Sequence, residues 1–491
     1  MSQLPGSPGY GLATADPPRD RSSGPWAAFW LAALGTFLAY LDVTIVNIAF
    51  PDIAGDFDES GLGALSWVVN GYALAFAALL VVLGRAADRI GRRRIYLAGV
   101  AVFALASAAC AIAGSPAALV AARTVQGAAA AAMIPAALGL LLSAFPPQKW
   151  AAVIAAWGAV GAVAAALGPP LGGLLTDAGS WRLIFLINVP VGIVTVLLGV
   201  RWLRESRAQE SAPPDLPGAA LLAGATGALA LGLVQGGDWG WASAATLGSF
   251  AAALVVGALL VARTRRIAAP VLEPALLRSR WVRAANFGTL AFGAALFASQ
   301  LCGVLFLTSV WGYSTLEAGM AAVPGALASA VAAPIGGRWA GRSGPGVVGA
   351  TGAALFAASL AWVIATAGES PQFLLVWLPF GIVGGAGIGL GLPALIGATA
   401  AGLPPARFAT GMALATTARQ LGAVLGVALL VAVVGTPSRG DALAAYDAGF
   451  ALCAIAVTLA AAASMLLGPR PSPVAAPAVG RQVARTSVAA G

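Results

Sequence analysis

The hydrophobic positions of this chain form long continuous runs, and the charged positions form short islands between them. A run of about 20 apolar residues can cross a hydrocarbon core about 30 Å thick as one α-helix. The pattern therefore predicts an all-α polytopic membrane protein with fourteen transmembrane spans. Their expected limits are roughly 26–48, 63–83, 95–114, 117–143, 150–176, 183–200, 217–236, 243–262, 286–309, 318–338, 346–366, 373–398, 410–434 and 445–467.

Composition agrees with this prediction, and the placement of charge adds an orientation. The 491 residues are 59% hydrophobic and 9% charged, whereas soluble proteins average about 25% charged residues. With the N-terminus in the cytoplasm, 23 of the 27 basic residues fall on the cytoplasmic side; Arg182 and Arg439 fall outside, and Arg123 and Arg419 lie within spans. Cytoplasmic loops are enriched in basic residues, so we expect a multi-pass protein of the cytoplasmic membrane with both termini in the cytoplasm.

A repeated sequence frame divides the chain. Residues 84–91 (GRAADRIG) and 337–344 (GRWAGRSG) share the pattern G-R-x-A-x-R-x-G, and each copy follows an even-numbered span. With two central spans set aside, both copies follow the second span of a six-span half, as in transporters built from repeats. The first 25 residues lack the apolar core of a signal peptide. The predicted divisions are a disordered cytoplasmic tail (1–25), a six-helix bundle (26–200), cytoplasmic linkers with two inserted helices (201–285), a second six-helix bundle (286–467) and a disordered cytoplasmic tail (468–491).

Asp42 is the acid that falls well inside a long apolar run. A carboxylate there costs about 2.5–3.5 kcal/mol to insert, so it is by default a site for a proton, an ion or a cationic ligand. The same run, LDVTIVNIAFP (41–51), also holds Asn47. The alternative is an acid that a neighbouring arginine neutralises in a purely structural role.

Two arginines lie within spans. Arg123 precedes Gln126 by three residues, which places both on one helix face. Arg123 is the expected partner of Asp42, and the opposing effects of burial and of a nearby cation would let Asp42 exchange protons near neutral pH. Arg419 lies nearer the inner end of its span, so it either snorkels to the membrane surface or faces a central cavity.

Two further motifs indicate moving parts. The run LGPPLGG (167–173) holds prolines that bend a helix and glycines that admit a neighbouring backbone, which favours a hinge or a closely packed seam; the residues concerned are Gly168, Pro169, Gly172 and Gly173. The charged turn GRAADRIGRRR (84–94) is interpreted as a latch between inward- and outward-facing states, or as a basic anchor on anionic lipid. Its candidate residues are Gly84, Asp88, Arg89, Gly91 and Arg92.

Several classes of protein are disfavoured. Histidine is absent, and Cys110, Cys302 and Cys453 are far apart in sequence, so neither a metal site nor a disulfide set is indicated. The basic residues flank spans, which is expected for a membrane protein and does not require nucleic acid. The spans hold no pair of side chains of the kind that an intramembrane enzyme uses for catalysis, so an enzyme is disfavoured. No P-loop is present, so we expect an ion gradient, with no cofactor, as the energy source.

Together these motifs resemble the major facilitator superfamily, and within it the fourteen-span drug:proton antiporters. The resemblance rests on residues 84–94, on Arg123, Gln126 and Gly127, on 167–173, on 41–51, on WRLIFLINVPVG (181–192), on DWGW (238–241) and on WGYSTLEAG (311–319). It implies two six-helix bundles with two inserted helices, and proton-coupled export of hydrophobic, often cationic, drugs by alternating access. The fourth-span residues would take part in proton transfer, and the fifth-span motif would mark an exporter.

The expected partners are thus protons, a small hydrophobic or cationic substrate and the lipid bilayer, with a monomer as the expected state. An acid in an otherwise apolar cavity would attract a lipophilic cation or a proton, and exclusive occupancy would couple the two. The alternatives are a proton-coupled importer or facilitator of a small metabolite, and an exporter of a lipid-like compound.

Overall fold

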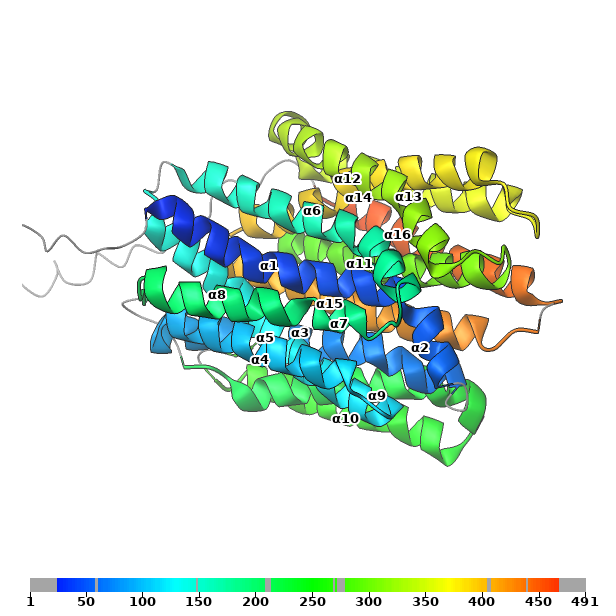
Figure 1. Cartoon of the computed structure of the whole chain (residues 1–491), viewed down its shortest axis with the longest axis horizontal. Coiled ribbons are helices and arrows are strands. Elements are labelled where there is room, and N and C mark those ends of the chain that lie inside the picture. Colours follow the sequence, from blue (N-terminus) through cyan, green and yellow to red (C-terminus); the bar gives the residue numbers. More distant parts are fainter. Residues whose placement is uncertain are drawn as a thin grey trace, which may run out of the picture.

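The protein is a bundle of long helices that run along a common direction (Figure 1). The computed structural model describes residues 24–57, 61–146, 149–207, 213–267, 270–271, 279–403, 408–438 and 440–467. Within these ranges, fourteen helical segments are long and apolar enough to cross a membrane. The predicted fourteen-span all-α architecture is therefore confirmed.

The helices fall into two sets that flank an inserted pair. The first set, called the first half below, comprises α1 (Pro25–Ile48), α2 (Phe50–Asp56), α3 (Gly61–Ile90), α4 (Arg92–Ala111), α5 (Pro116–Ala144), α6 (Trp150–Asp177), α7 (Leu183–Leu186) and α8 (Asn188–Trp202). The inserted pair is α9 (Leu216–Trp239) and α10 (Ala244–Thr264). The second half comprises α11 (Arg280–Ser309), α12 (Thr315–Ser343), α13 (Pro345–Thr366), η4 (Phe373–Trp377), α14 (Leu378–Ala401), α15 (Phe408–Val434) and α16 (Ala442–Met465).

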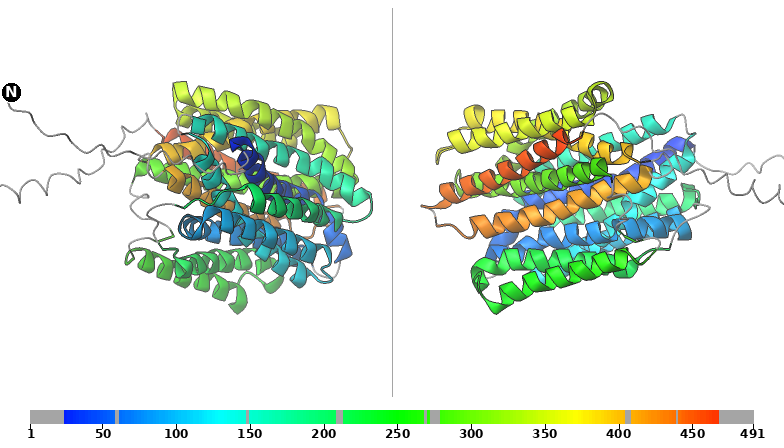
Figure 2. Two further views of the ribbon diagram at one scale, coloured as in Figure 1. Left: turned by 60° about the vertical axis from the view of Figure 1, so that its left-hand side comes forward. Right: turned by 180° about the vertical axis from the view of Figure 1, so that it is seen from behind.

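Packing within each half exceeds packing between them. In the first half, α5 packs against α3 and α4, α4 also packs against α8, and α1 packs against α6. In the second half, α11 packs against α15 and α16, and α14 packs against α12 and α13. The halves meet along two helix pairs, α6 with α12 and α3 with α15, and the α15 ribbon runs beside the first half when seen from behind (Figure 2).

The two copies of the repeated frame adopt the same local geometry. Each copy ends a long helix, α3 or α12, and its last glycine has a positive φ, 134° at Gly91 and 85° at Gly344. This conformation suits glycine because it lacks a Cβ. The next helix begins at the following residue, Arg92 or Pro345. The repeat predicted from the amino-acid sequence is therefore also present in the backbone conformation.

One end of the bundle is closed between the halves. We call it the α2 end, because α2 lies there together with the loop between α11 and α12 (Figure 1). The Thr315 hydroxyl, at the first residue of α12, donates a hydrogen bond of 2.5 Å to the Asp52 carboxylate of α2. A single hydrophobic cluster runs from the second half into this end of the first half, through Ala49 between α1 and α2 and through Phe50 and Ile53 of α2. The rest of the first half encloses a separate cluster.

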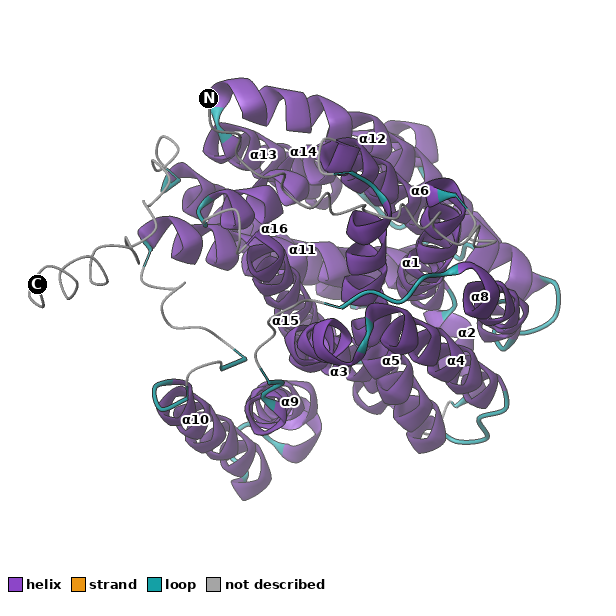
Figure 3. Cartoon of the chain, turned by 90° about the vertical axis from the view of Figure 1, so that its left-hand side faces the viewer, coloured by secondary structure: helices purple, strands orange, loops and turns teal. Residues whose placement is uncertain are grey.

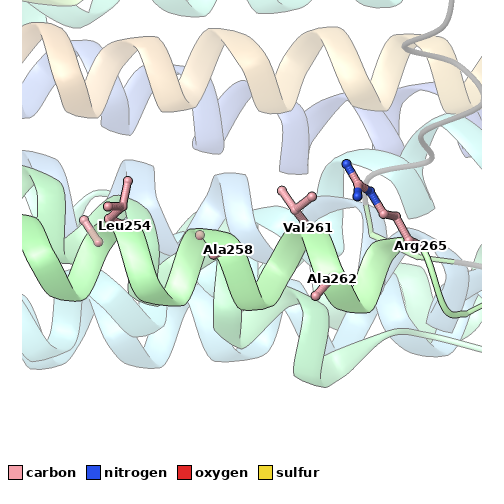
Figure 4. Close-up of a pocket in the computed structure, with 7 residues that line it drawn as sticks. Leu254, Ala258, Val261, Ala262 and Arg265 are labelled. Carbon is pink, nitrogen blue, oxygen red and sulfur yellow. The ribbon is translucent and has the colours of Figure 1, made fainter.

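The inserted pair lies at one edge of the bundle, apart from the second half's α12, α13 and α14 (Figure 3). Helices α9 and α10 pack on each other, and α9 also contacts α3 and α15. The outward face of α10 stays exposed along Leu254, Ala258, Val261 and Arg265, with Leu254 77% exposed (Figure 4). Such an apolar face is suited to contact with lipid chains.

A buried carboxylate fastens the pair to the rest of the chain. Asp215, at the start of α9, accepts hydrogen bonds from the Arg263 guanidinium of α10 (2.8 and 3.0 Å) and from the backbone N–H groups of Gly218 and Val271. Burial opposes ionisation of Asp215, but the Arg263 hydrogen bonds and the two N–H groups outweigh it and lower the pKa of this carboxyl. One side chain thus joins both inserted helices and the segment that follows them.

We predict that Asp215→Ala lowers the free energy of unfolding by about 2 kcal/mol, because the helix start and Arg263 both lose their acceptor. A carboxyl with a lowered pKa contributes stability above its ordinary pKa of about 3.9, and that contribution disappears as the pH falls through the lowered value. Thermal unfolding of the purified protein at neutral and acidic pH measures both effects. Asp238→Ala, at the exposed far end of the same helix, is the control; equal melting temperatures for the two variants would contradict the prediction.

Candidate functional site

Asp42 lies inside the first half and is 0% exposed. Its Oδ2 accepts a hydrogen bond from Arg123 Nη1 of α5 in a buried ion pair. Its Oδ1 accepts hydrogen bonds from Gln126 Nε2 of α5 at 2.8 Å and from Asn188 Nδ2 of α8 at 3.3 Å. The carboxylate on α1 is therefore held by side chains from two neighbouring helices, and the expected pairing of Asp42 with Arg123 is present.

Arg123 is held on several sides as well. Its guanidinium donates to Gln126 Oε1 at 2.6 Å and, through Nε, to the Val68 carbonyl of α3 at 3.0 Å. The guanidinium carbon lies 4.4 Å from the centre of the Tyr72 ring and 5.8 Å from that of Phe185. These contacts enclose the cation between aromatic faces and leave Arg123 1% exposed.

Asn188 and Ser107 were not among the residues predicted from the sequence. Ser107 Oγ of α4 accepts hydrogen bonds from Gln126 Nε2 at 2.7 Å and from Asn188 Nδ2 at 3.3 Å. Pro190 lacks the N–H that would bond to the Leu186 carbonyl, and the helix is interrupted at Ile187, directly before Asn188. A polar residue two positions before a proline inside an apolar run was the available signal.

Asn47 does not join the Asp42 cluster. Its Nδ2 donates a hydrogen bond of 3.2 Å to Gln300 Oε1 of α11, so it links α1 to the second half. Asn47 is 2% exposed, and no group in the described residues donates to its buried Oδ1. Gln300, which the sequence analysis did not select, is its partner across the interface.

Arg419 also contacts the other half. Its guanidinium carbon lies 5.7 Å from the centre of the Tyr40 ring, in the middle of α1. Its backbone carbonyl lies against Gly293 of α11, where a Cβ would collide with it. The side chain therefore crosses the interface toward α1 and does not reach along its helix to the membrane surface, which favours the second of the two interpretations given for this residue.

Arg419 and Asn47 are thus separated from Asp42, Arg123 and Gln126. The structure brings together only three of the five residues predicted for coupling or substrate binding. The carboxylate of Asp42 points into the first half, where side chains of that half occupy both of its oxygens. In this conformation a cargo molecule between the halves does not reach it.

The glycine–proline motif forms a seam at which three helices meet. A Cβ at Gly168 would collide with the Thr44 side chain of α1, and one at Gly172 would lie 3.0 Å from Ile45. Gly173 faces the start of α12 at Leu316, and the Pro169 carbonyl faces Gly319 of the same helix. The motif thus gives α6 close approach both to its own half and to the second half, at the closed α2 end.

The candidate residues of the charged turn are fastened within the first half. Arg92 donates to Asp88 Oδ1 at 2.8 Å and to the Gly139 carbonyl of α5 at 3.2 Å. The carboxylate of Glu205, just beyond α8, lies against Gly91 and accepts a hydrogen bond of 3.0 Å from the Arg93 N–H. Gly84 faces Pro135 of α5, and Arg89 is exposed. A role as a latch between the halves stays a prediction.

Asp447 lies near the start of a span. It occupies the second turn of α16, which begins at Ala442 and not at the predicted 445. No group in the described part of the chain donates to its buried Oδ1.

With this arrangement in view, comparisons with known proteins identify the class of protein. The sequence model of the Major Facilitator Superfamily matches residues 32–315. The chain is 36% identical over 412 residues to the tetracenomycin C resistance and export protein of Streptomyces glaucescens, covering 83% of this chain and 75% of that protein. It is 34% identical over 468 residues to the methylenomycin A resistance protein of Streptomyces coelicolor, covering 92% and 93%. It is 34% identical over 450 residues to a cephamycin export protein of Amycolatopsis lactamdurans, covering 90% and 92%.

Solved structures agree on the fold. A bacterial homologue of the human lysosomal transporter Spinster superposes with a TM-score of 0.62 at 17% identity, covering 90% of this chain and 96% of that one. The nucleoside transporter NupG gives 0.62 at 13% identity, with 89% and 99% covered. The protein is a multi-pass membrane transporter and not an enzyme. It belongs to the Major Facilitator Superfamily, and the resemblance to its drug-efflux members is confirmed by the resistance and export proteins among its relatives.

We predict that Gly168→Ala lowers the free energy of unfolding by about 1–3 kcal/mol, because the added methyl overpacks the contact with Thr44. Gly158→Ala is the matched control, since it lies in the same helix and nothing lies within 4 Å of its Cβ position. There the alanine is expected to be neutral or slightly stabilising. Thermal unfolding of both variants tests the seam, and equal effects would disprove close packing at Gly168.

Proposed function

We propose that the protein exports antibiotics and related hydrophobic compounds, cationic ones included, across the cytoplasmic membrane in exchange for protons. The observation that carries the proposal is the ion pair of Asp42 and Arg123, buried inside the first half with its own hydrogen-bond network. A buried pair of this kind is weak evidence for stability and is costly to break, so a role in function is the better explanation. The relatives' names, which state antibiotic resistance and export, support the direction of transport and the cargo.

Coupling follows from the position of α1. This helix carries Asp42, and it also carries Tyr40 and Asn47, which contact Arg419 and Gln300 of the second half. Protonation of Asp42 removes the negative charge that holds Arg123, so the balance of contacts on one side of α1 changes. Because the helix is a rigid element, the contacts on its other side change with it. Asp42 is thus assigned to the proton, and the cargo to the interface between the halves.

Alternating access follows from the closed end. With the termini in the cytoplasm, the α2 end faces outside, and the hydrogen bond between Thr315 and Asp52 closes it. In a cycle of alternating access, export requires this contact to open. The proton gradient drives the cycle without a cofactor. One chain supplies both halves, so we expect a monomer to suffice.

We predict that Asp42→Asn abolishes substrate-driven proton movement. Inside-out vesicles with an acidified interior and a pH-sensitive dye report proton release when tetracenomycin C, methylenomycin A, a cephamycin or a lipophilic cation is added. Release should fall at least tenfold, while Asp177→Asn, at an exposed helix end, should behave as wild type. Undiminished release in Asp42→Asn would remove this residue from the coupling path.

Loss of fold is a separate outcome that a second variant distinguishes. Asp42→Asn leaves Arg123 as an uncompensated buried charge, which costs about 3–5 kcal/mol. The double variant Asp42→Asn/Arg123→Gln removes both charges and should recover the melting temperature but not the proton release. Proton uptake together with the compound, in place of release, would favour the importer. Response only to an amphipathic lipid would favour the lipid exporter.

We further predict that a cross-link at the closed end stops transport. Cysteines placed at Asp52 and Thr315, in a background without the native cysteines, should be joined by a short bifunctional thiol reagent, and reduction should restore export. The matched pair is Asp56 and Arg182, whose side chains form an ion pair of 2.6 Å within the first half. Cross-linking that pair should leave export unchanged. Full export with the Asp52–Thr315 link in place would exclude opening at this end.

A further inference from the structure

The charge that reaches the interface between the halves is positive. The acid within α1 is neutralised inside the first half by Arg123. Within the spans, the side-chain contacts between the halves include the amide pair of Asn47 with Gln300, a hydrogen bond of 3.5 Å from the Thr417 hydroxyl to the Ala77 carbonyl, and the approach of Arg419 to Tyr40. Among the side chains in these contacts only Arg419 carries a charge.

Arg419 has no acidic partner among the described residues. The ion pairs found there join Asp42, Asp56, Asp88, Glu205 and Asp215 to other arginines. Arg419 Nε is buried, and no described group accepts a hydrogen bond from it. The side chain as a whole is half-buried, so part of the guanidinium stays accessible. A guanidinium removed from water without an acceptor is costly, and a bound anion would offset that cost.

The position of Arg419 is fixed by the backbone around it. Gly293 of α11 lies against the Arg419 carbonyl, and Gly422 and Gly426 of α15 lie against the carbonyls of Leu290 and Ala294. At each of these three contacts a Cβ would collide with the facing backbone. Close packing on this side sets the rotation of α15 and directs the Arg419 side chain toward α1.

An aromatic ring lies beside the cation. Tyr40 is half-buried and lies 5.7 Å from the guanidinium carbon. Flat aromatic compounds bind well to an accessible ring of this kind, and a guanidinium adds hydrogen bonds to carboxylate, phenolate or carbonyl oxygens.

We propose that the interface between the halves takes aromatic compounds that carry an acidic or oxygen-rich group, with Arg419 as the counter-charge and Tyr40 as the stacking surface. The proposal rests on the proposed export function and narrows its cargo. An exposed Asp42 would favour cationic cargo. Because Asp42 is buried and Arg419 is only half-buried, the interface favours anionic cargo instead. Proton and cargo then bind at different places, one inside the first half and one between the halves.

A pair of dyes of equal size and opposite charge tests the preference. Fluorescein is an anionic xanthene at neutral pH, and rhodamine methyl ester is its cationic counterpart. Fluorescence anisotropy with the full chain in lipid nanodiscs should show tighter binding of fluorescein. Loss of a charge-assisted hydrogen bond commonly costs about a factor of ten or more, so Arg419→Gln should weaken fluorescein at least tenfold and leave rhodamine methyl ester unchanged or improved.

Two controls separate charge from fold. Arg419→Lys keeps the positive charge and should recover part of the fluorescein affinity, since lysine cannot reproduce the planar donor set. Arg201→Gln removes one exposed arginine at the end of α8 and should bind as wild type. Melting temperatures of all variants show whether the fold is intact.

Equal or tighter binding of the cationic dye by wild type would overturn the proposal. Unchanged fluorescein affinity in a folded Arg419→Gln variant would overturn it as well. The assay uses no proton gradient, so it does not depend on coupling. If the protein prefers fluorescein but shows no substrate-driven proton release, the cargo site is supported and antiport is refuted. If it shows substrate-driven proton release but no preference for fluorescein, the cargo site alone is refuted.

Discussion

The ion pair between Asp42 and Arg123 is the constraint around which the first half is arranged. A carboxylate and a guanidinium can lie this deep in an apolar bundle only if their remaining donors and acceptors are matched. Gln126, Asn188 and the Val68 carbonyl supply that matching, and they come from α3, α5 and α8. Ser107 extends the network to α4. Four helices, α3, α4, α5 and α8, are thereby joined to α1 through two charged side chains and their hydrogen bonds.

Glycine determines where the two halves touch. At the α2 end, Gly173 and Gly319 let α6 and α12 approach at backbone distance. Within the second half, Gly293, Gly422 and Gly426 let α11 and α15 approach in the same way. The contact of α6 with α12 is made by backbone atoms, so it resists compression but holds the halves with few directional bonds. The hydrogen bonds between the halves, from Thr315 to Asp52, from Asn47 to Gln300 and from Thr417 to the Ala77 carbonyl, are few, and none joins two charged groups. Such an interface is specific and still separable.

Much of the fold could be predicted from the sequence, and less of the site. Apolar runs and basic islands predict the spans because each run must satisfy its own backbone within lipid. The pairing of Asp42 with Arg123 was predictable for the same reason, since each is the natural partner of the other inside an apolar bundle. The direction in which Asp42 points was not, because it depends on the rotation of α1, which is set by Gly168 and Gly172 packing on Thr44 and Ile45. Asn188, Ser107 and Gln300 were missed because a single neutral polar residue in a span carries little signal without its neighbours.

The inserted helices have a mechanical consequence. Helix α9 contacts α3 of the first half and α15 of the second, and these two also contact each other. Any change in the angle between α3 and α15 must therefore be accommodated along α9. Its sequence between Gly218 and Gly236 is largely glycine, alanine and leucine, and a smooth surface of this kind permits sliding. Asp215 holds the start of α9 to α10 and to the chain leading into α11. Reorientation of the halves would therefore move α3 and α15 along the small-residue surface of α9, whose start is held in place by Asp215.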